Sequence, residues 1–444
     1  MKESHLPIEF LNRLRSQLGD DFADFIAEHS NPAPVSVRIN PFKKTALFDS
    51  HEKVPWATNA YYLPDRISFT HDPLFHAGCY YVQEASSMFL EKALTIAFAD
   101  GKPLKILDLC AAPGGKSTHI ASCMPEGSLL VANEVISNRN IVLQQNIVKW
   151  GLANVVITQN ETTDFSRLEG FFDVIVIDAP CSGEGLFRKD PAAVDHWSVD
   201  NVAMCASRQK AILNEIYPSL KQGGYLIYST CTYEEKENEE QVLRLMQEYA
   251  MEAVTIADAT NSSLAKKSGT QFYPHRVKGE GFFIAMLRKI EDGHQVAITK
   301  SKAKVAKEVS GFLESYLEDP SIFLPLVKNN ELYALPSTIY DEINLLMNNL
   351  FVRKAGIHVG TIKGKDLVPS HELALSVALK KDIPRMEFTR EDAIRYLKCE
   401  SINAAGMNNG WVVITFKNIS LGWIKVIGSR TNNYFPRSQR ILKP

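Results

Sequence analysis

The sequence predicts an α/β fold built around a doubly wound, mostly parallel sheet. Short apolar runs alternate with helix-patterned segments between residues 104 and 290, and most runs end in small or polar residues. Apolar runs of this kind are typical of parallel strands that helices cover on both faces. The expected strands lie at 104–109, 129–133, 155–158, 174–178 and 225–229, with an antiparallel pair near 271–273 and 281–287. The expected helices lie near 116–124, 137–150, 200–219 and 236–251.

Two further regions flank this sheet, so the chain is divided at 1–100, 101–290, a linker at 291–307, and 308–444. The first region opens with apolar residues at helical spacing, then a strand near 35–39 and a helix after residue 87. The linker is polar and lysine-rich. The last region is an α+β segment ending in two alternating strands, 411–416 and 422–427, which favour a small β-barrel.

Composition excludes several classes of protein. No run of about 18 apolar residues occurs, so no membrane span is expected. The seven cysteines are widely spaced and form no C-x-x-C pair, which favours reduced thiols in the cytoplasm and argues against a zinc site. We therefore expect a cytoplasmic chain without a metal, and a monomer.

The charge pattern bears on nucleic acid. A net charge of −2 argues weakly against nucleic-acid binding, but the chain carries no acidic residue after Glu400. A one-signed tail of this kind suits a phosphate backbone, and a solvated surface patch is the equal alternative. The basic residues of this tail are Lys417, Lys425, Arg430, Arg437, Arg440 and Lys443.

A small-residue turn follows the first strand of the sheet and leads into a helix. Small residues let a ligand approach the backbone, and a helix N-terminus offers free N–H groups. The turn is not a phosphate-binding Walker loop, because Cys110 stands where that motif requires glycine, and no G-x-G-x-x-G pattern occurs. ATP and NAD are therefore disfavoured. The turn residues are Cys110, Ala111, Ala112, Pro113, Gly114, Gly115 and Lys116.

Two polar residues at the ends of the next strands fit a nucleoside. Glu134 follows the second strand, where a carboxylate accepts hydrogen bonds from both ribose hydroxyls. Asn160 follows the third strand and either contacts an adenine edge or is an ordinary turn asparagine. A small-residue turn, a ribose acid and no phosphate cradle together favour S-adenosylmethionine.

Two cysteines, Cys181 and Cys231, each follow an apolar run of the predicted sheet. Ligands of open α/β sheets bind at the carboxyl ends of the strands, so both thiols are expected to face one cleft. A thiol in a cleft is a candidate nucleophile, and a buried small hydrophobe is the alternative.

With these motifs in view, the sequence resembles the Nol/Nop/Sun family of RNA cytosine-C5 methyltransferases, whose catalytic domain has a Rossmann-like fold. The resemblance covers roughly residues 30–290, and its motifs are highly specific as a set. They are Tyr80–Glu84, Asp108–Thr118, Asp178–Pro191, Ser229–Thr232, Pro274–Arg276 and Gly279–Phe283. The tail, with Gly422-Trp423 and Asn432–Pro436, is similar to the RNA-binding PUA-like end of bacterial rRNA members of the RsmF type.

The resemblance implies a division of labour between the thiols. Cys231 would add to C6 of cytosine, which turns C5 into a nucleophile, and Cys181 would serve release of the methylated product. Asp178 would hold N3 and the exocyclic amine, and Lys116 would lie near both cofactor and base. DNA cytosine-C5 enzymes use only the Pro-Cys thiol, so the Thr-Cys site separates the RNA class.

The expected activity is S-adenosylmethionine-dependent methylation of cytosine C5 in RNA, with 16S rRNA as the first choice of substrate. A tRNA enzyme and a non-catalytic RNA-binding ribosome assembly factor are the alternatives. The regions 1–100 and 308–444 are expected to bind RNA. Four residues near the catalytic strands are candidates for phosphate contacts, with ordinary surface charge as the alternative: Arg188, Lys189, His275 and Arg276.

Overall fold

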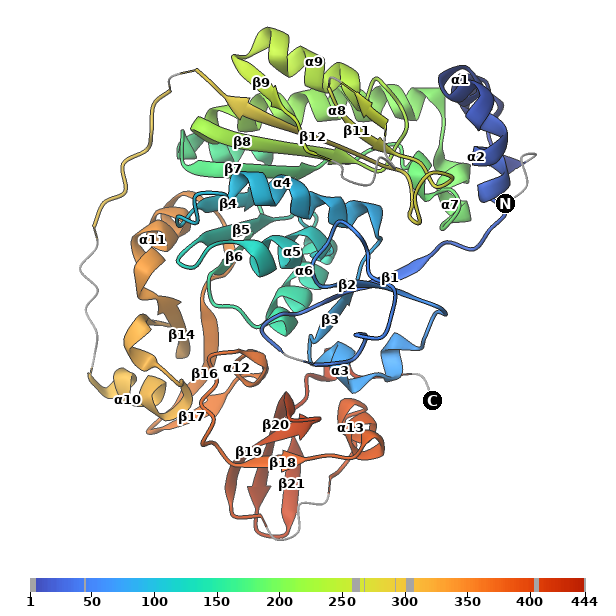
Figure 1. Ribbon diagram of the computed structural model, residues 1–444. Coiled ribbons are helices and arrows are strands. Elements are labelled where there is room, and N and C mark those ends of the chain that lie inside the picture. Colours follow the sequence, from blue (N-terminus) through green and yellow to red (C-terminus); the bar gives the residue numbers. More distant parts are fainter. Residues whose placement is uncertain are drawn as a thin grey trace.

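The computed structural model describes residues 5–43, 45–257, 264–266, 268–291, 293–300, 307–402 and 407–442. A large mixed sheet with helices on both faces forms the upper part of the molecule in Figure 1, and the C-terminal region lies below it. Both ends of the chain lie away from the large sheet in Figure 1. No helix among the residues described is long and apolar enough to cross a membrane.

The central sheet has the strand order β10-β11-β12-β8-β7-β4-β5-β6-β15, and β9 pairs with β12. Its inner strands β8, β7, β4, β5 and β6 are parallel, as the sequence predicts. Antiparallel strands add to both edges. The bounds are β4 Lys105–Asp108, β5 Leu129–Asn133, β6 Val155–Thr158, β7 Phe172–Asp178, β8 Leu220–Thr230, β9 Met251–Val254, β10 Leu264–Lys266, β11 Gly269–Phe272, β12 Phe282–Lys289 and β15 Val352–Lys354.

Helices cover the two faces of this sheet because alternate strand residues point to opposite sides. Ile106 belongs to a core with α4 (Leu90–Ala97), α5 (Gly115–Cys123) and α6 (Ser137–Trp150). Leu107 belongs to the opposite core, with α8 (Val199–Ile216), α9 (Glu239–Glu248) and α11 (Tyr340–Asn349). The predicted helices and parallel strands are confirmed, with ends that differ by a few residues.

The chain reverses its direction of winding between β4 and β7. From β4 it proceeds through β5 and β6 on one side, then returns to build β7 and β8 on the other. The crevice at such a reversal is where open α/β sheets bind ligands. Asp108 ends β4 and Asp178 ends β7, so both lie at this crevice.

The N-terminal region has two parts that pack in different places. The helices α1 (Ile8–Leu18) and α2 (Phe22–Glu28) pack through Phe10 and Phe25 on Tyr233, next to the catalytic strands and α7 (Pro191–His196). The strands β1 (Val35–Ile39), β2 (Ala60–Leu63) and β3 (Tyr80–Val82) form a separate sheet in the order β2-β1-β3. Helix α3 (Pro73–His76) packs beside β3.

The C-terminal region contains two further sheets, ordered β13-β14-β16-β17 and β18-β19-β20-β21. The second sheet lies where the sequence predicts a small β-barrel. Within the part of the chain described, no backbone pairing joins its two outer strands, β18 and β21. The bounds are α10 Lys307–Tyr316, β13 Phe323–Lys328, β14 Glu331–Pro336, β16 Ile357–Lys363, β17 Asp366–Pro369, α12 His371–Leu375, β18 Arg385–Glu387, α13 Arg390–Leu397, β19 Gly410–Phe416, β20 Ile419–Ile427 and β21 Arg430–Asn433.

Short-range sequence patterns do not predict how this region joins the rest. Helix α11 packs on the central sheet and β15 pairs antiparallel with β6, so part of the C-terminal region completes the catalytic fold. The last sheet packs on the N-terminal strands through Ile414 and Val37. Part of the expected linker, residues 301–306, and the basic residue Lys443 lie outside the described residues.

Candidate active site

The two candidate thiols meet at the carboxyl ends of adjacent parallel strands. Asp178 of β7 stands level with Ser229 of β8, so the turns after both strands emerge side by side. The Sγ atoms of Cys181 and Cys231 are 3.1 Å apart, and the backbone N–H of Cys231 donates to the Cys181 sulfur at 3.3 Å. The two thiols therefore lie side by side, and the cleft that the sequence analysis expects around them stays a prediction.

The surroundings distinguish the two thiols. The hydrogen bond to Cys231, burial and the negative charge of Glu237 together raise the pKa of the Cys181 thiol well above its ordinary value. The Cys181 thiol therefore keeps its proton at neutral pH, and either sulfur can donate the hydrogen bond that joins the two.

Lys116 and Asp178 form an ion pair beside the thiols. Lys116 Nζ lies 2.9 Å from Asp178 Oδ2, and Ser229 Oγ donates to Asp178 Oδ1 at 2.9 Å. Burial alone would lower the pKa of Lys116, but the carboxylates of Asp178 and Asp108 and the nearby Cys231 sulfur raise it. The lysine is thus held cationic next to the proposed nucleophile.

A buried carboxylate that sequence reasoning missed connects the two cysteine turns. Glu237 Oε2 accepts the backbone N–H of Ser182 at 3.0 Å and the Gln209 amide at 2.8 Å, and Glu237 Oε1 accepts the Ser182 hydroxyl. Ser182 Oγ also bonds Thr232 Oγ1 at 2.9 Å. Because Ser182 follows Cys181 and Thr232 follows Cys231, Glu237 fixes both turns. Its position six residues after Cys231 gives no periodic or motif signal.

The small-residue turn from Cys110 to Lys116, called the cofactor turn below, is held by hydrogen bonds to backbone carbonyl groups. Ala111 N–H donates to Asn133 O at 2.8 Å, and the Arg139 guanidinium donates to Ala112 O at 2.9 Å. Gly114 has φ +110°, a conformation that L side chains rarely adopt, and a Cβ there would meet the Leu143 side chain at 3.3 Å. The turn therefore needs glycine at this position, while Gly115 and Lys116 begin helix α5.

A cavity of about 470 Å³ lies beside this turn, and it is lined by Leu109, Cys110, Glu134, Ile136, Asn160 and Pro180, among others. Glu134 is nearly buried; its Oε1 accepts the Ile136 N–H at 2.9 Å, and its Oε2 lies 3.4 Å from Arg139. Apolar side chains line the cavity together with charged ones, which are Glu134, Arg139, Glu161, Arg208 and Glu215. A carboxylate at the end of β5, as Glu134 is, suits the hydroxyls of a ribose.

Asn160 lines the same cavity but is also tied to the sheet edge. Its Oδ1 accepts the Phe351 N–H at 2.9 Å and its Nδ2 donates to Phe351 O at 3.2 Å. An amide has four hydrogen-bonding positions, so two remain for a ligand. The contact with an adenine edge stays a prediction.

Asp108 is a second buried carboxyl group that the sequence did not single out. Its Oδ2 accepts the Ser117 hydroxyl at 2.6 Å, whereas its Oδ1 is buried and has no hydrogen-bond partner among the described residues. Burial raises the pKa of Asp108 to about 7, with Asp178 and Glu134 adding to the rise and Ser117 and Lys116 opposing it.

The four candidate phosphate contacts lie in different environments. Arg188 is wrong for this role, because its guanidinium is nearly buried and pairs with Glu28 at 2.6 Å and Glu280 at 2.8 Å. Arg276 pairs with Asp21, which also lies 3.9 Å from His275. These residues attach the N-terminal helix α2 to the catalytic domain. Lys189 is exposed, so a phosphate contact there stays a prediction.

The basic tail residues remain accessible. Lys417, Arg430, Arg437 and Arg440 are exposed, and none forms an ion pair within the described part of the chain. Lys425 lies over the Trp411 ring at 5.1 Å.

Comparison with known proteins covers all three regions of the chain. The family described as 16S rRNA methyltransferase RsmB/F matches residues 94–288. The N-terminal domain of 16S rRNA methyltransferase RsmF matches residues 6–85, and the methyltransferase RsmF PUA domain matches residues 384–441.

Relatives align along nearly the whole length. The ribosomal RNA small subunit methyltransferase F of Shigella boydii is 30% identical over 98% of this chain and 96% of its own length. The chain belongs to the RsmF family of 16S rRNA methyltransferases. Another RsmF relative, from Shewanella piezotolerans, is 28% identical over 98% of this chain and 97% of its own.

Solved structures show the same fold as this RsmF-family chain. A methyltransferase homologue from Pyrococcus horikoshii, 28% identical, superposes with a TM-score of 0.54 over 65% of this chain and 100% of its own. NSun6 from Pyrococcus horikoshii, 20% identical, superposes with a TM-score of 0.53 over 64% of this chain and 99% of its own.

Proposed function

We propose that this RsmF-family protein transfers a methyl group from S-adenosylmethionine to C5 of a cytosine in 16S rRNA. The observation that carries the proposal is the pair of thiols 3.1 Å apart beside the Lys116–Asp178 ion pair. Membership of the RsmF family favours the ribosomal substrate over tRNA. The retained thiols, acid and lysine argue against a non-catalytic assembly factor.

The cavity beside the cofactor turn fits S-adenosylmethionine. Glu134 would bind the ribose hydroxyls, and Leu109, Ile136 and Pro180 would pack against the adenine. The orphaned Oδ1 of Asp108 supplies a buried acceptor near the turn, which suits a cationic ligand. The remaining turn residues, Cys110 to Lys116, and Asn160 would complete the site. When bound, S-adenosylmethionine supplies the methyl group that C5 takes up.

The chain's own residues activate and release the base. The Cys231 thiolate forms a bond to C6, and the electron pair displaced from the C5–C6 double bond makes C5 nucleophilic. Asp178 accepts a hydrogen bond from the exocyclic amine of cytosine and holds the adjoining N3, where negative charge develops and a proton is taken up. Release requires that the C5 proton leaves and that the C6–S bond breaks. The contact between Cys181 and Cys231 supports assigning Cys181 to this release step, in which it takes up the C5 proton after giving up its own.

RNA binding is assigned to the flanking regions, 1–100 and 308–444. The exposed arginines of the last sheet support a phosphate contact there. The helices α1 and α2 adjoin the catalytic loops through Arg13, which pairs with Glu184 at 2.6 Å. A segment this close to the thiols is suited to guiding the RNA strand into the cleft.

A trapping experiment tests the chemistry. Cys181→Ala should add to and methylate the RNA but fail to release it, so a denaturation-resistant protein–RNA band should appear on a gel. Cys231→Ala, and the variant with both changes, should give no band and no transfer of tritiated methyl groups. Cys399→Ala, which changes a half-buried cysteine in the C-terminal region, is the matched control.

The reverse pattern would contradict the assignment. A band that requires Cys181 and accumulates on loss of Cys231 would mean DNA-type chemistry. Absence of methyl transfer by the unchanged protein to 16S rRNA, either naked or in the small subunit, would contradict the proposed substrate.

A further inference from the structure

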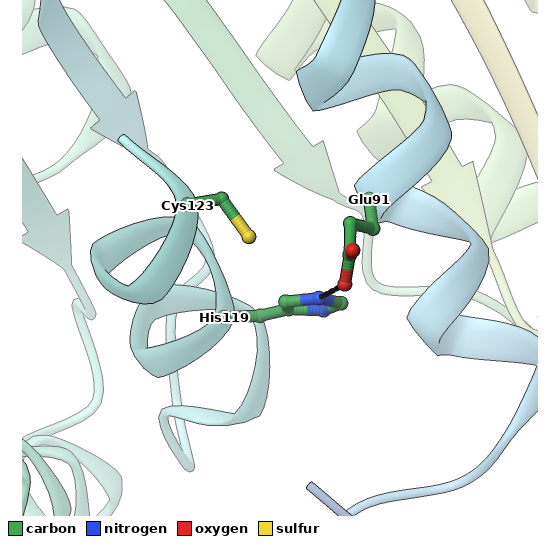
Figure 2. A group of neighbouring side chains, drawn as sticks. All are labelled: Glu91, His119 and Cys123. Atoms are coloured by element: carbon green, nitrogen blue, oxygen red, sulfur yellow. Dashed lines mark hydrogen bonds and ion pairs between the residues drawn. The ribbon is translucent and has the colours of Figure 1, made fainter. Parts of the chain in front are cut away.

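A second group of reactive side chains lies farther along helix α5 than Lys116. His119 and Cys123 are one helical turn apart, and Glu91 of α4 faces them across the contact between the two helices. Figure 2 shows the three side chains converging. One donor atom from each lies within 4.8 Å of the other two. None of the three has a role in the proposed methyl transfer.

The His119 ring is fully buried, and only one of its two nitrogens has a partner among the described residues. Its Nε2 lies 2.9 Å from Glu91 Oε2. Its Nδ1 is buried and has no hydrogen-bond partner among the described residues. An unpaired ring nitrogen at a buried position is costly unless a ligand engages the ring.

The other two donors border open space. A cavity of about 440 Å³ is lined by Glu91, His119 and Cys123 together with Arg38, Thr58 and Ser122. The Cys123 thiol gives up its proton when it binds a cation, because only the thiolate is a metal ligand. The cavity leaves room for a fourth ligand such as water.

We propose that Glu91, His119 and Cys123 form a binding site for a thiophilic divalent metal ion of the zinc type. One carboxylate, one imidazole and one thiolate suit Zn²⁺ or Co²⁺, whereas Mg²⁺ and Ca²⁺ prefer oxygen ligands. The two anionic ligands neutralise the cation. The Arg38 guanidinium, which donates to uncharged groups such as the Ser122 hydroxyl, then faces a neutral site.

The fit requires a small contraction. Ligand bonds of about 2.0–2.3 Å place donors about 3.3–3.8 Å apart in a tetrahedral site, so the widest separation must shorten by about 1 Å. Rotation of the Glu91 and Cys123 side chains achieves this, because both border the cavity. Glu91 Oε1 keeps its bond from the Thr58 N–H at 2.9 Å, which orients the carboxylate from behind.

Such an ion would fix α4 to the helix that begins at the cofactor turn. Glu91 lies far from His119 and Cys123 in the sequence, so the three residues form no short metal-binding motif such as C-x-x-C. The sequence therefore gives no sign of the site. The role is structural, and it is separate from the methyl transfer proposed above.

Cobalt titration tests the site. The full-length protein carrying Cys181→Ser and Cys231→Ser is used first, because those adjacent sulfurs are the alternative binding place. One Co²⁺ per chain should bind, with the near-ultraviolet thiolate band and the visible bands of tetrahedral cobalt. Adding Cys123→Ser should remove the thiolate band, while adding Cys205→Ser, at another buried cysteine, should leave it unchanged.

A nearly isosteric variant guards against loss of folding. Glu91→Gln in the same background should weaken cobalt binding about 10- to 100-fold, because one charged ligand is lost, while the thermal melting curve without metal stays cooperative. Binding that survives Cys123→Ser, or no stoichiometric binding to the parent background at micromolar Co²⁺, would overturn the proposal. Binding seen only when Cys181 and Cys231 are present would assign the metal to the thiol pair instead.

Discussion

Glu237 accepts both hydrogen bonds that Ser182 has to donate, one from its backbone N–H and one from its hydroxyl. The Ser182 oxygen also meets Thr232, so one carboxylate sets the separation of the turns that carry Cys181 and Cys231. Burial raises the pKa of Glu237, against the hydrogen bonds from Ser182 and Gln209 that favour its charged form.

Glu237→Gln should therefore impair catalysis without weakening RNA binding. An amide cannot accept both Ser182 bonds as a carboxylate does, and loss of a charge-assisted bond of about 1.5–3 kcal/mol corresponds to about a 10- to 150-fold fall in kcat. Loss of the negative charge also removes one cause of the raised Cys181 pKa. The pH dependence of product release should move to lower pH, while KM for RNA stays the same.

The control for this measurement is Glu240→Gln, an exposed change three residues later, in the first turn of α9. A Glu237→Gln enzyme with an unchanged pH profile and kcat would show that the carboxylate does not position the thiols.

Glu134→Ala should weaken S-adenosylmethionine binding. Removal of charge-assisted bonds to the ribose should cost about 1.5–3 kcal/mol, or about 10- to 150-fold in Kd by calorimetry. Glu134→Gln keeps an oxygen for the Ile136 N–H and should show a smaller loss. Equal affinity in all three proteins would remove Glu134 from the cofactor site.

Replacing Arg430, Arg437 and Arg440 together by glutamine should reduce RNA affinity and flatten its dependence on salt. Each lost phosphate contact lowers the slope of log K against log salt by about 0.7–0.9. The matched control removes three positive charges at the opposite, amino-terminal edge of the central sheet: Lys102→Gln, Lys221→Gln and Arg288→Gln. If both triple variants lose the same slope, the last sheet has no particular role in binding RNA.

Asp108→Asn should stabilise the protein at high pH. The pKa of Asp108 is raised from an unfolded value of 3.8 to about 7, so the folded chain binds more protons between these values. Its contribution to stability is consequently lost as the pH rises from about 4 to 7. The melting temperature of the variant should exceed that of the parent at pH 8 and match it near pH 4.5. Asp195→Asn, at an exposed position, should change neither value.

The sequence predicts the parts of this protein in which local pattern and motif agree. The parallel strands, their helices and the turn from Cys110 to Lys116 all follow from short apolar runs and small residues close together in the chain. The proximity of Cys181 and Cys231 follows from the same rule, because parallel strands end at one edge. What the sequence does not predict depends on contacts between distant segments.

Arg188 illustrates why these contacts escape prediction. A lysine or arginine after a catalytic strand has the same sequence signature whether it faces RNA or pairs with Glu28 and Glu280, which lie far away in the chain. Buried carboxylates such as Asp108 and Glu237 have no periodicity that separates them from surface acids.

Strand β15 has a practical consequence for dissecting the enzyme. The short segment Val352–Lys354 covers the outer edge of β6, and Asn160 is fastened to its neighbour Phe351. Deletion of the residues from 308 onward would leave the outer edge of β6 unpaired and would expose the apolar surface beneath α11. Both changes promote aggregation. A chimera that exchanges the C-terminal RNA-binding part between related enzymes should therefore be joined near residue 384, where the PUA match begins. The catalytic part of each chimera then keeps its own β15 beside β6.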